Sequence, residues 1–181
     1  MWTTASEFGF GRLGRLSLAA WVGVLVALSG CGGDAAASDE RGVWTSNATK
    51  MVAIRQGAGF GPSAPAGSKC DALGEGSYTF TVADKHLGWH LCAGQASTPY
   101  DFVDGGRVLD ANEAKRLVTT LQAVAVYSGN GCGADKPNYS LKVTTPAGER
   151  EYLDSFYACN MQGTYVDGID EVLAAASDLA H

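Results

Sequence analysis

The sequence predicts an α+β domain in which an antiparallel sheet of about five strands carries two helices packed on one face. Short segments that alternate apolar and polar residues, typical of half-buried strands, recur between residues 50 and 157. Two other segments place apolar residues three and four positions apart, which indicates amphipathic helices. The segments follow one another as strand, hairpin, helix, hairpin, helix, an order that favours one sheet covered by helices.

The first three strands are expected over Lys50–Arg55, Ser77–Val82 and Leu87–Cys92. The second and third alternate in opposite directions around the polar turn Ala83–His86, which predicts a hairpin. If Val82 lies opposite Leu87, the apolar side chains of both strands share one face.

A second hairpin is expected farther along the chain. Tyr139–Thr145 alternates cleanly, and Pro146-Ala147-Gly148-Glu149 predicts a turn. The returning segment, Arg150–Tyr157, does not alternate cleanly, which indicates either a bulge or a strand buried on both faces.

Both helices have recognisable first turns. Asp110 with Glu113 three residues later predicts an N-cap with a capping box. Asp167 is the expected cap of the last helix, where Asp170 and Glu171 complement the helix dipole. The apolar stripes comprise Ala114, Leu117, Val118, Leu121 and Val124 or Ala125 in the first helix, and Ile169, Val172, Leu173, Ala176 and Leu179 or Ala180 in the second.

The N-terminal segment has the composition of a targeting peptide. Arg12 and Arg15 precede an almost wholly apolar run, Leu16–Leu28, which is too short for the roughly 20 residues of a spanning helix. The small residues Ser29 and Gly30 follow, and then Cys31. An uncleaved membrane anchor, or a chance cysteine after an ordinary signal peptide, is the alternative interpretation.

Leu28-Ser29-Gly30-Cys31 resembles the lipobox of bacterial lipoproteins. The resemblance implies a diacylglycerol on the Cys31 thiol, cleavage before Cys31, and acylation of the new amine by a fatty acid such as palmitate. The expected organisation is a signal peptide over residues 1–30, the lipidated cysteine and a flexible tether over 31–43, and one globular domain over 44–181. Gly32, where an aspartate would retain a lipoprotein in the inner membrane, favours the outer membrane of a bacterial envelope.

Charge and cysteine content restrict the possible partners. Residues 31–181 contain 11 basic and 18 acidic residues, which argues against nucleic acid or anionic lipid headgroups as partners. Besides Cys31 there are four cysteines, an even number that indicates two disulfides in an oxidising compartment. Three pairings are possible, and the hairpins favour the two that are local in sequence, Cys70–Cys92 and Cys132–Cys159.

No catalytic, cofactor or metal motif is present, so we expect no enzyme, cofactor or bound metal. His86 and His90 could share a strand face with Asp84, but no third ligand is required, and surface histidines are the simpler interpretation. Asp101, Asp104 and Asp110 crowd one segment without the spacing of a calcium loop. The cysteines lack the short spacing of zinc ligands.

Two long loops, Gln56–Lys69 and Ala93–Arg107, are the expected binding elements. Four aromatic residues lie in or beside loops, where a large ring needs either a pocket or a partner: Trp44, Phe60, Tyr100 and Phe102. The first hypothesis is therefore a non-catalytic, membrane-anchored module that binds another envelope component.

Two alternative hypotheses for the function remain open. The Gly57–Lys69 loop, rich in Gly and Pro and ended by Cys70, could present extended backbone to a protease cleft. Arg55-Gln56-Gly57-Ala58-Gly59-Phe60, with Leu109-Asp110 opening a helix, resembles the emfourin family of small bacterial metalloprotease inhibitors, which implies inhibition of a protease. The other alternative is an enzyme that uses Asp and Glu side chains for acid–base chemistry.

Overall fold

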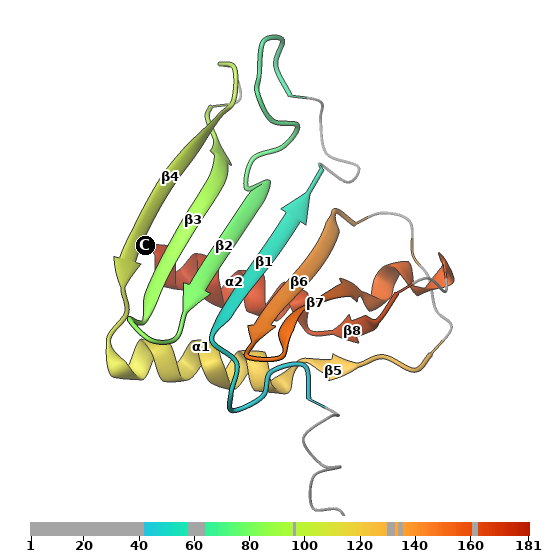
Figure 1. The fold of residues 1–181 in the computed structure, drawn as a ribbon. Helices are drawn as coiled ribbons and strands as arrows, with labels where there is room; N and C mark the ends of the chain where they lie inside the picture. The colour runs from blue at the N-terminus through green and yellow to red at the C-terminus, as the bar shows by residue number, and fades with distance from the viewer. Residues whose placement is uncertain (1–41, 58–63, 96, 130–132, 134–135, 161–162) are drawn as a thin grey trace, which may run out of the picture. The chain divides into compact units, whose positions relative to one another are not determined.

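The structure is a computed structural model that describes residues 42–57, 64–95, 97–129, 133, 136–160 and 163–181. The expected α+β class is confirmed, with two α-helices and one sheet (Figure 1). The sheet has eight strands among the described residues, not five, and it is mixed instead of antiparallel because β7 and β8 run parallel. Residues 1–30, and with them Cys31 and most of the expected tether, lie outside the described residues.

The strands follow one another in the sheet as β4-β3-β2-β1-β6-β7-β8-β5. Their bounds are β1 Lys50–Gln56, β2 Gly76–Thr81, β3 His86–Ala93, β4 Asp101–Val108, β5 Ala125–Val126, β6 Asn138–Thr145, β7 Gly148–Asp154 and β8 Tyr165–Asp167. The helices are α1 Ala111–Ala123, the 3₁₀ helix η1 Ser155–Asn160, and α2 Ile169–Ala180.

The first hairpin forms as predicted, but its register differs by two residues. Phe80 lies opposite Leu87, where the sequence suggested Val82. The cause is the turn: β2 ends at Thr81, and Lys85 adopts a left-handed conformation (φ 53°) that returns the chain earlier. A shift of two residues preserves the face, so the apolar side chains still point toward the core.

Strand β4 takes up the last seven residues of a segment that we expected to be a loop, Ala93–Arg107. Its two glycines explain how it pairs with β3. A Cβ at Gly105 would come within 2.3 Å of the Trp89 ring, and one at Gly106 within 2.8 Å of the His86 ring. The two rings therefore lie across the glycines on opposite faces of the sheet, and the cross-strand packing offsets the low strand propensity of glycine.

One face of the sheet contacts the helices. Helix α2 lies behind β1, β3 and β6, and α1 runs beside α2 (Figure 1). The inward-facing strand residues are directly opposed across five strands, and they join the helix stripes in one core. These residues are Met51, Ala53, Tyr78, Phe80, Leu87, Leu141, Val143 and Tyr152.

The first turn of α1 confirms its prediction. The Asp110 carboxylate accepts hydrogen bonds from the backbone N–H groups of Asn112 and Glu113, and the Glu113 carboxylate accepts one from the Asp110 N–H. These backbone hydrogen bonds lower the pKa values of both carboxyl groups. The predicted cap of α2 is wrong: Gly168 caps that helix with a left-handed backbone, and Asp167 instead accepts a hydrogen bond from Ser155 Oγ.

The second hairpin and the disulfides need correction. β7 ends at Asp154, and η1 accounts for the irregular pattern for which we expected a bulge or a strand buried on both faces. The described residues form one disulfide, Cys70–Cys92, where two were expected. Cys159 is exposed and carries a free thiol, and Cys132 lies outside the described residues. No helix of the described part of the chain is long and apolar enough to cross a membrane.

Candidate binding site at the disulfide-linked loops

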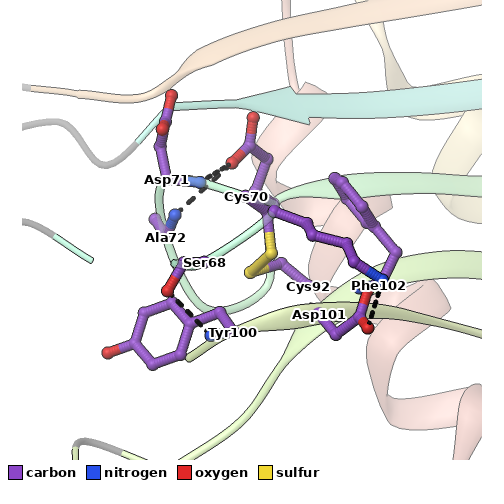
Figure 2. Close-up of a disulfide and its surroundings, with 10 residues drawn as sticks. Ser68, Cys70, Asp71, Ala72, Cys92, Tyr100, Asp101 and Phe102 are labelled. Atoms are coloured by element: carbon purple, nitrogen blue, oxygen red, sulfur yellow. Dashed lines mark hydrogen bonds and ion pairs between the residues drawn. A yellow bond between two sulfur atoms is a disulfide. The ribbon is translucent and has the colours of Figure 1, made fainter. Parts of the chain in front are cut away.

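Two connections lie together at one end of the sheet, and we call them the linked loops: residues 64–75, which precede β2, and residues 94, 95 and 97–100, which precede β4. The Cys70–Cys92 disulfide, with a Cα–Cα distance of 6.0 Å, fastens the first loop to the end of β3 (Figure 2). Both cysteines are buried and form a small apolar cluster with Tyr100 that is separate from the main core. The disulfide therefore takes the place of the hydrophobic core beneath these loops.

Backbone hydrogen bonds join the two loops directly. The Lys69 N–H donates to the Tyr100 carbonyl at 2.8 Å. The Tyr100 N–H donates to Ser68 Oγ at 2.8 Å (Figure 2). Lys69 Nζ also contacts the Asp101 carboxylate at 2.7 Å. The hydrogen bond from Lys69 lowers the pKa of Asp101. Because both side chains are largely exposed, the ion pair contributes little to stability, and the backbone bonds position the loops.

The turn after Cys70 is also ordered from within. The Glu75 carboxylate accepts hydrogen bonds from the backbone N–H groups of Asp71 (2.7 Å) and Ala72 (3.4 Å). The Gly74 N–H donates to the Cys92 carbonyl at 2.9 Å, which holds the turn against β3. Leu73, in the middle of this turn, is 44% exposed and is one of five large exposed apolar residues among those described. The turn thus presents an apolar side chain from a fixed backbone.

The aromatic residues selected from the sequence have different fates. Tyr100 is buried beneath the linked loops and Trp44 in the main core, so both serve packing. Phe102 is half-buried and stacks on His90 with ring centroids 4.4 Å apart. Phe60 lies outside the described residues, as does most of the first half of the Gly57–Lys69 loop.

The histidines and aspartates weighed as metal ligands do not meet. His90 Nδ1 contacts Asp104 at 2.7 Å, Asp101 pairs with Lys69, and Asp110 caps α1. Among the residues that the structure describes, no cluster of three His, Cys, Asp or Glu side chains could hold a metal ion.

A second polar cluster surrounds Lys136 beside the start of α2, next to a depression of about 450 Å³. Lys136 Nζ lies 3.0 Å from Asp154 and 3.4 Å from Asp170, and 4.8 Å from the centre of the Tyr139 ring. Asp154 is 3% exposed and is the only buried charged residue among those described. Burial lowers the pKa of Lys136, but the two carboxylates outweigh this effect and leave that pKa above its ordinary value.

The same cluster contains a pair of carboxyl groups with divergent proton affinities. A hydrogen bond between Asp170 and Glu171 lowers the pKa of Asp170 and raises that of Glu171. Such a pair can in principle donate and accept a proton, but both residues are largely exposed. Sequence reasoning missed this cluster because Lys136 and Asp154 lie on separate segments with no shared spacing. The only available signal was the aspartate at the end of a strand pattern.

No family model, curated protein or solved structure matches this chain.

Proposed function

We propose that this protein is a non-catalytic, lipid-anchored module of the bacterial cell envelope that binds another envelope protein through the linked loops. The anchor follows from the resemblance of Leu28–Cys31 to a lipobox, with the lipid on Cys31 and the outer membrane as the favoured location. The single observation that supports the binding site is the Cys70–Cys92 disulfide, which fastens the first of the linked loops to the end of β3, directly before the second.

The physical reason is conformational entropy. A binding loop that is ordered only on contact loses free energy to ordering, at about 0.5–1.5 kcal/mol for each immobilised side chain. The disulfide and the Lys69–Tyr100 backbone bond hold the described part of these loops before a partner arrives. A surface ordered in this way suits recognition, because it presents the exposed Leu73 side chain on fixed backbone.

Inhibition of a protease is a specific form of the same proposal. The Gly57–Lys69 loop ends at Cys70, so a protease cleft could receive its backbone while the disulfide resists displacement of the loop. The resemblance of Arg55–Phe60 to the emfourin family favours a metalloprotease as the target. Assays of the purified full chain against metallo- and serine proteases separate this form from other binding functions. If neither class of protease is inhibited, the inhibitor form of the proposal is wrong.

The linked-loop proposal predicts that Leu73→Lys lowers recovery of the bound partner at least about fivefold in affinity capture from intact envelopes. The reason is that one apolar contact at an interface contributes about 1 kcal/mol or more. The matched control is Val126→Lys, because Val126 is 50% exposed on β5, far along the sheet from the loops. Equal loss with both variants, or with neither, contradicts the proposed site.

The anchor has its own test. Mass spectrometry of the N-terminal peptide from the native protein is expected to find Cys31 as the first residue, bearing a thioether-linked diacylglycerol and an acylated amine. A Cys31→Ser variant is expected to lose both the lipid and its membrane association. A native chain that retains Met1–Gly30 and an unmodified Cys31 contradicts the anchor. The linked-loop proposal is then still tested separately, by the Leu73→Lys variant.

A further inference from the structure

Strand β4 forms one end of the sheet, and no described strand pairs with its outer edge (Figure 1). The opposite end differs: β5 has only two residues, and Gly42 pairs with Ala125 across its edge. Long uncovered edges invite pairing with another chain, and proteins ordinarily shorten or cover them. With eight residues, β4 is long enough to receive an added strand.

The hydrogen bonds of β3 determine which backbone groups of β4 face outward. The Leu109 N–H donates to the Lys85 carbonyl at 2.9 Å, so that pair and every second pair after it point toward β3. The residues between them point their N–H and C=O groups away from the sheet. These residues are Phe102, Asp104, Gly106 and Val108.

The chain itself occupies the first position along this edge. Like Phe102 and Asp104, Tyr100 points its backbone N–H and C=O groups away from β3. The Tyr100 N–H donates to Ser68 Oγ, and the Tyr100 carbonyl accepts from the Lys69 N–H. The Phe102 N–H is bonded by the Asp101 carboxylate at 2.8 Å. Beyond Phe102, no described residue outside β4 bonds the outward backbone groups. An added strand that lay along β4 beyond the position of Lys69 could therefore bond the outward backbone groups of Asp104, Gly106 and Val108.

The side chains along the edge indicate which kinds of residue a strand added there would contain. The Asp104 side chain is 80% exposed and is hydrogen-bonded to His90, while Val103 and Val108 are 47% and 65% exposed. The one cation of β4, Arg107, is already bound by Glu113 and the Leu179 carbonyl. The edge is thus acidic and apolar, with no free positive charge of its own.

We propose that the outer edge of β4 binds an extended, basic segment of a partner polypeptide as an added strand of the sheet. Backbone bonds to Asp104, Gly106 and Val108 supply the affinity, and a lysine or arginine opposite Asp104 supplies the selectivity. A second copy of this chain is disfavoured as the occupant because the protein is acidic, with a net charge of −6. Antiparallel self-pairing centred on Asp104 would also place two carboxylates directly opposite each other.

The test uses the full chain in detergent and a labelled peptide, Thr-Lys-Val-Lys-Val-Lys-Thr, with Thr-Glu-Val-Glu-Val-Glu-Thr as its acidic match. Fluorescence anisotropy is expected to show saturable binding of the basic peptide only. Val108→Pro removes an outward N–H at an edge position that tolerates proline, and it should weaken binding about fivefold or more. Asp104→Lys should abolish the preference for the basic peptide. Glu149→Lys makes the same charge change on an exposed residue of β7 and should behave nearly as wild type.

Three results would overturn the inference: no saturable binding by wild type, equal binding by wild type and Val108→Pro, or equal effects of Asp104→Lys and Glu149→Lys. Thermal melts of each variant separate loss of binding from loss of fold. Analytical ultracentrifugation tests whether a second copy of this chain occupies the edge. A dimer that dissociates in the Val108→Pro variant would assign the edge to that second copy. The Leu73→Lys variant should bind the peptide as wild type does, so failure of the edge inference and failure of the linked-loop proposal are distinguishable.

Discussion

Lys136→Ala is expected to lower the free energy of unfolding by about 3 kcal/mol, because it leaves the Asp154 carboxylate buried without its cation. Among the described residues, Asp154 would then keep the Phe156 backbone N–H as its remaining hydrogen-bond donor, at 2.8 Å. The Lys136 side chain is itself 24% exposed, which places the estimate at the lower end of the range for broken buried pairs. Equilibrium urea unfolding followed by tryptophan fluorescence provides the measurement.

The double variant Lys136→Met, Asp154→Leu tests the cause. Replacing a buried ion pair with apolar residues of similar size is often neutral, so this variant should recover most of the lost stability. The raised pKa of Lys136 means that its ion pairs stabilise the fold fully below the ordinary lysine pKa of about 10.4. That contribution is lost as the pH rises through the higher pKa of the folded state. Wild type should therefore lose more stability than the double variant above about pH 10, and parallel pH profiles would contradict this account.

Replacing both Cys70 and Cys92 with serine is expected to cost about 3 kcal/mol of unfolding free energy. The bond closes a loop with a sequence separation of 22 residues, and on the chain-entropy model its removal releases that much entropy into the unfolded state. Hydrogen exchange should also accelerate at the Lys69 and Tyr100 amides, because the bonds between the linked loops lose their support.

The matched control for the disulfide is Cys159→Ser, since Cys159 is exposed and its thiol is free. We expect that substitution to change stability by less than about 0.5 kcal/mol. If the double serine variant unfolds at the same urea concentration as the control, the disulfide does not stabilise the domain. The entropic argument for the linked loops would then fail with it.

Local patterns predicted the elements whose residues are half-buried and regular. Alternation identified β2 and β3, and the capping residues Asp110 and Glu113 located the start of α1. The hairpin register could not be predicted, because it depends on Lys85 adopting a left-handed conformation, which lysine seldom does. Alternation specifies a face, and a two-residue shift leaves that face unchanged.

The strands that sequence analysis missed are defined by their partners. β4 contains Asp101, Asp104 and two glycines, a composition that disfavours strands, and it forms because the Trp89 and His86 rings pack over those glycines. β5 and β8 have two and three residues, too few for any periodicity. Their pairing with each other depends on where α1 and η1 end, which no short segment of sequence specifies.

The candidate site was predictable in part. The spacing of the cysteines and the hairpin indicated the Cys70–Cys92 bond, and the loops were recognised by their Gly and Pro content. The ion pair of Lys136 with Asp154 was not recognised, because tertiary structure alone brings a loop lysine to the end of β7. The prediction that Asp167 caps α2 was wrong for a similar reason, because the Asp167 carboxylate accepts a hydrogen bond from Ser155 of η1.

The pairing of Gly42 with Ala125 has a geometric consequence for the strand addition proposed at β4. The described chain enters the domain at the β5 flank, and β4 is the last of eight strands counted from there. At about 4.8 Å between neighbouring strands, the two flanks are separated by roughly 30 Å. A strand added along β4 would thus lie at the flank opposite Gly42, and the two would not compete for the same edge of the sheet.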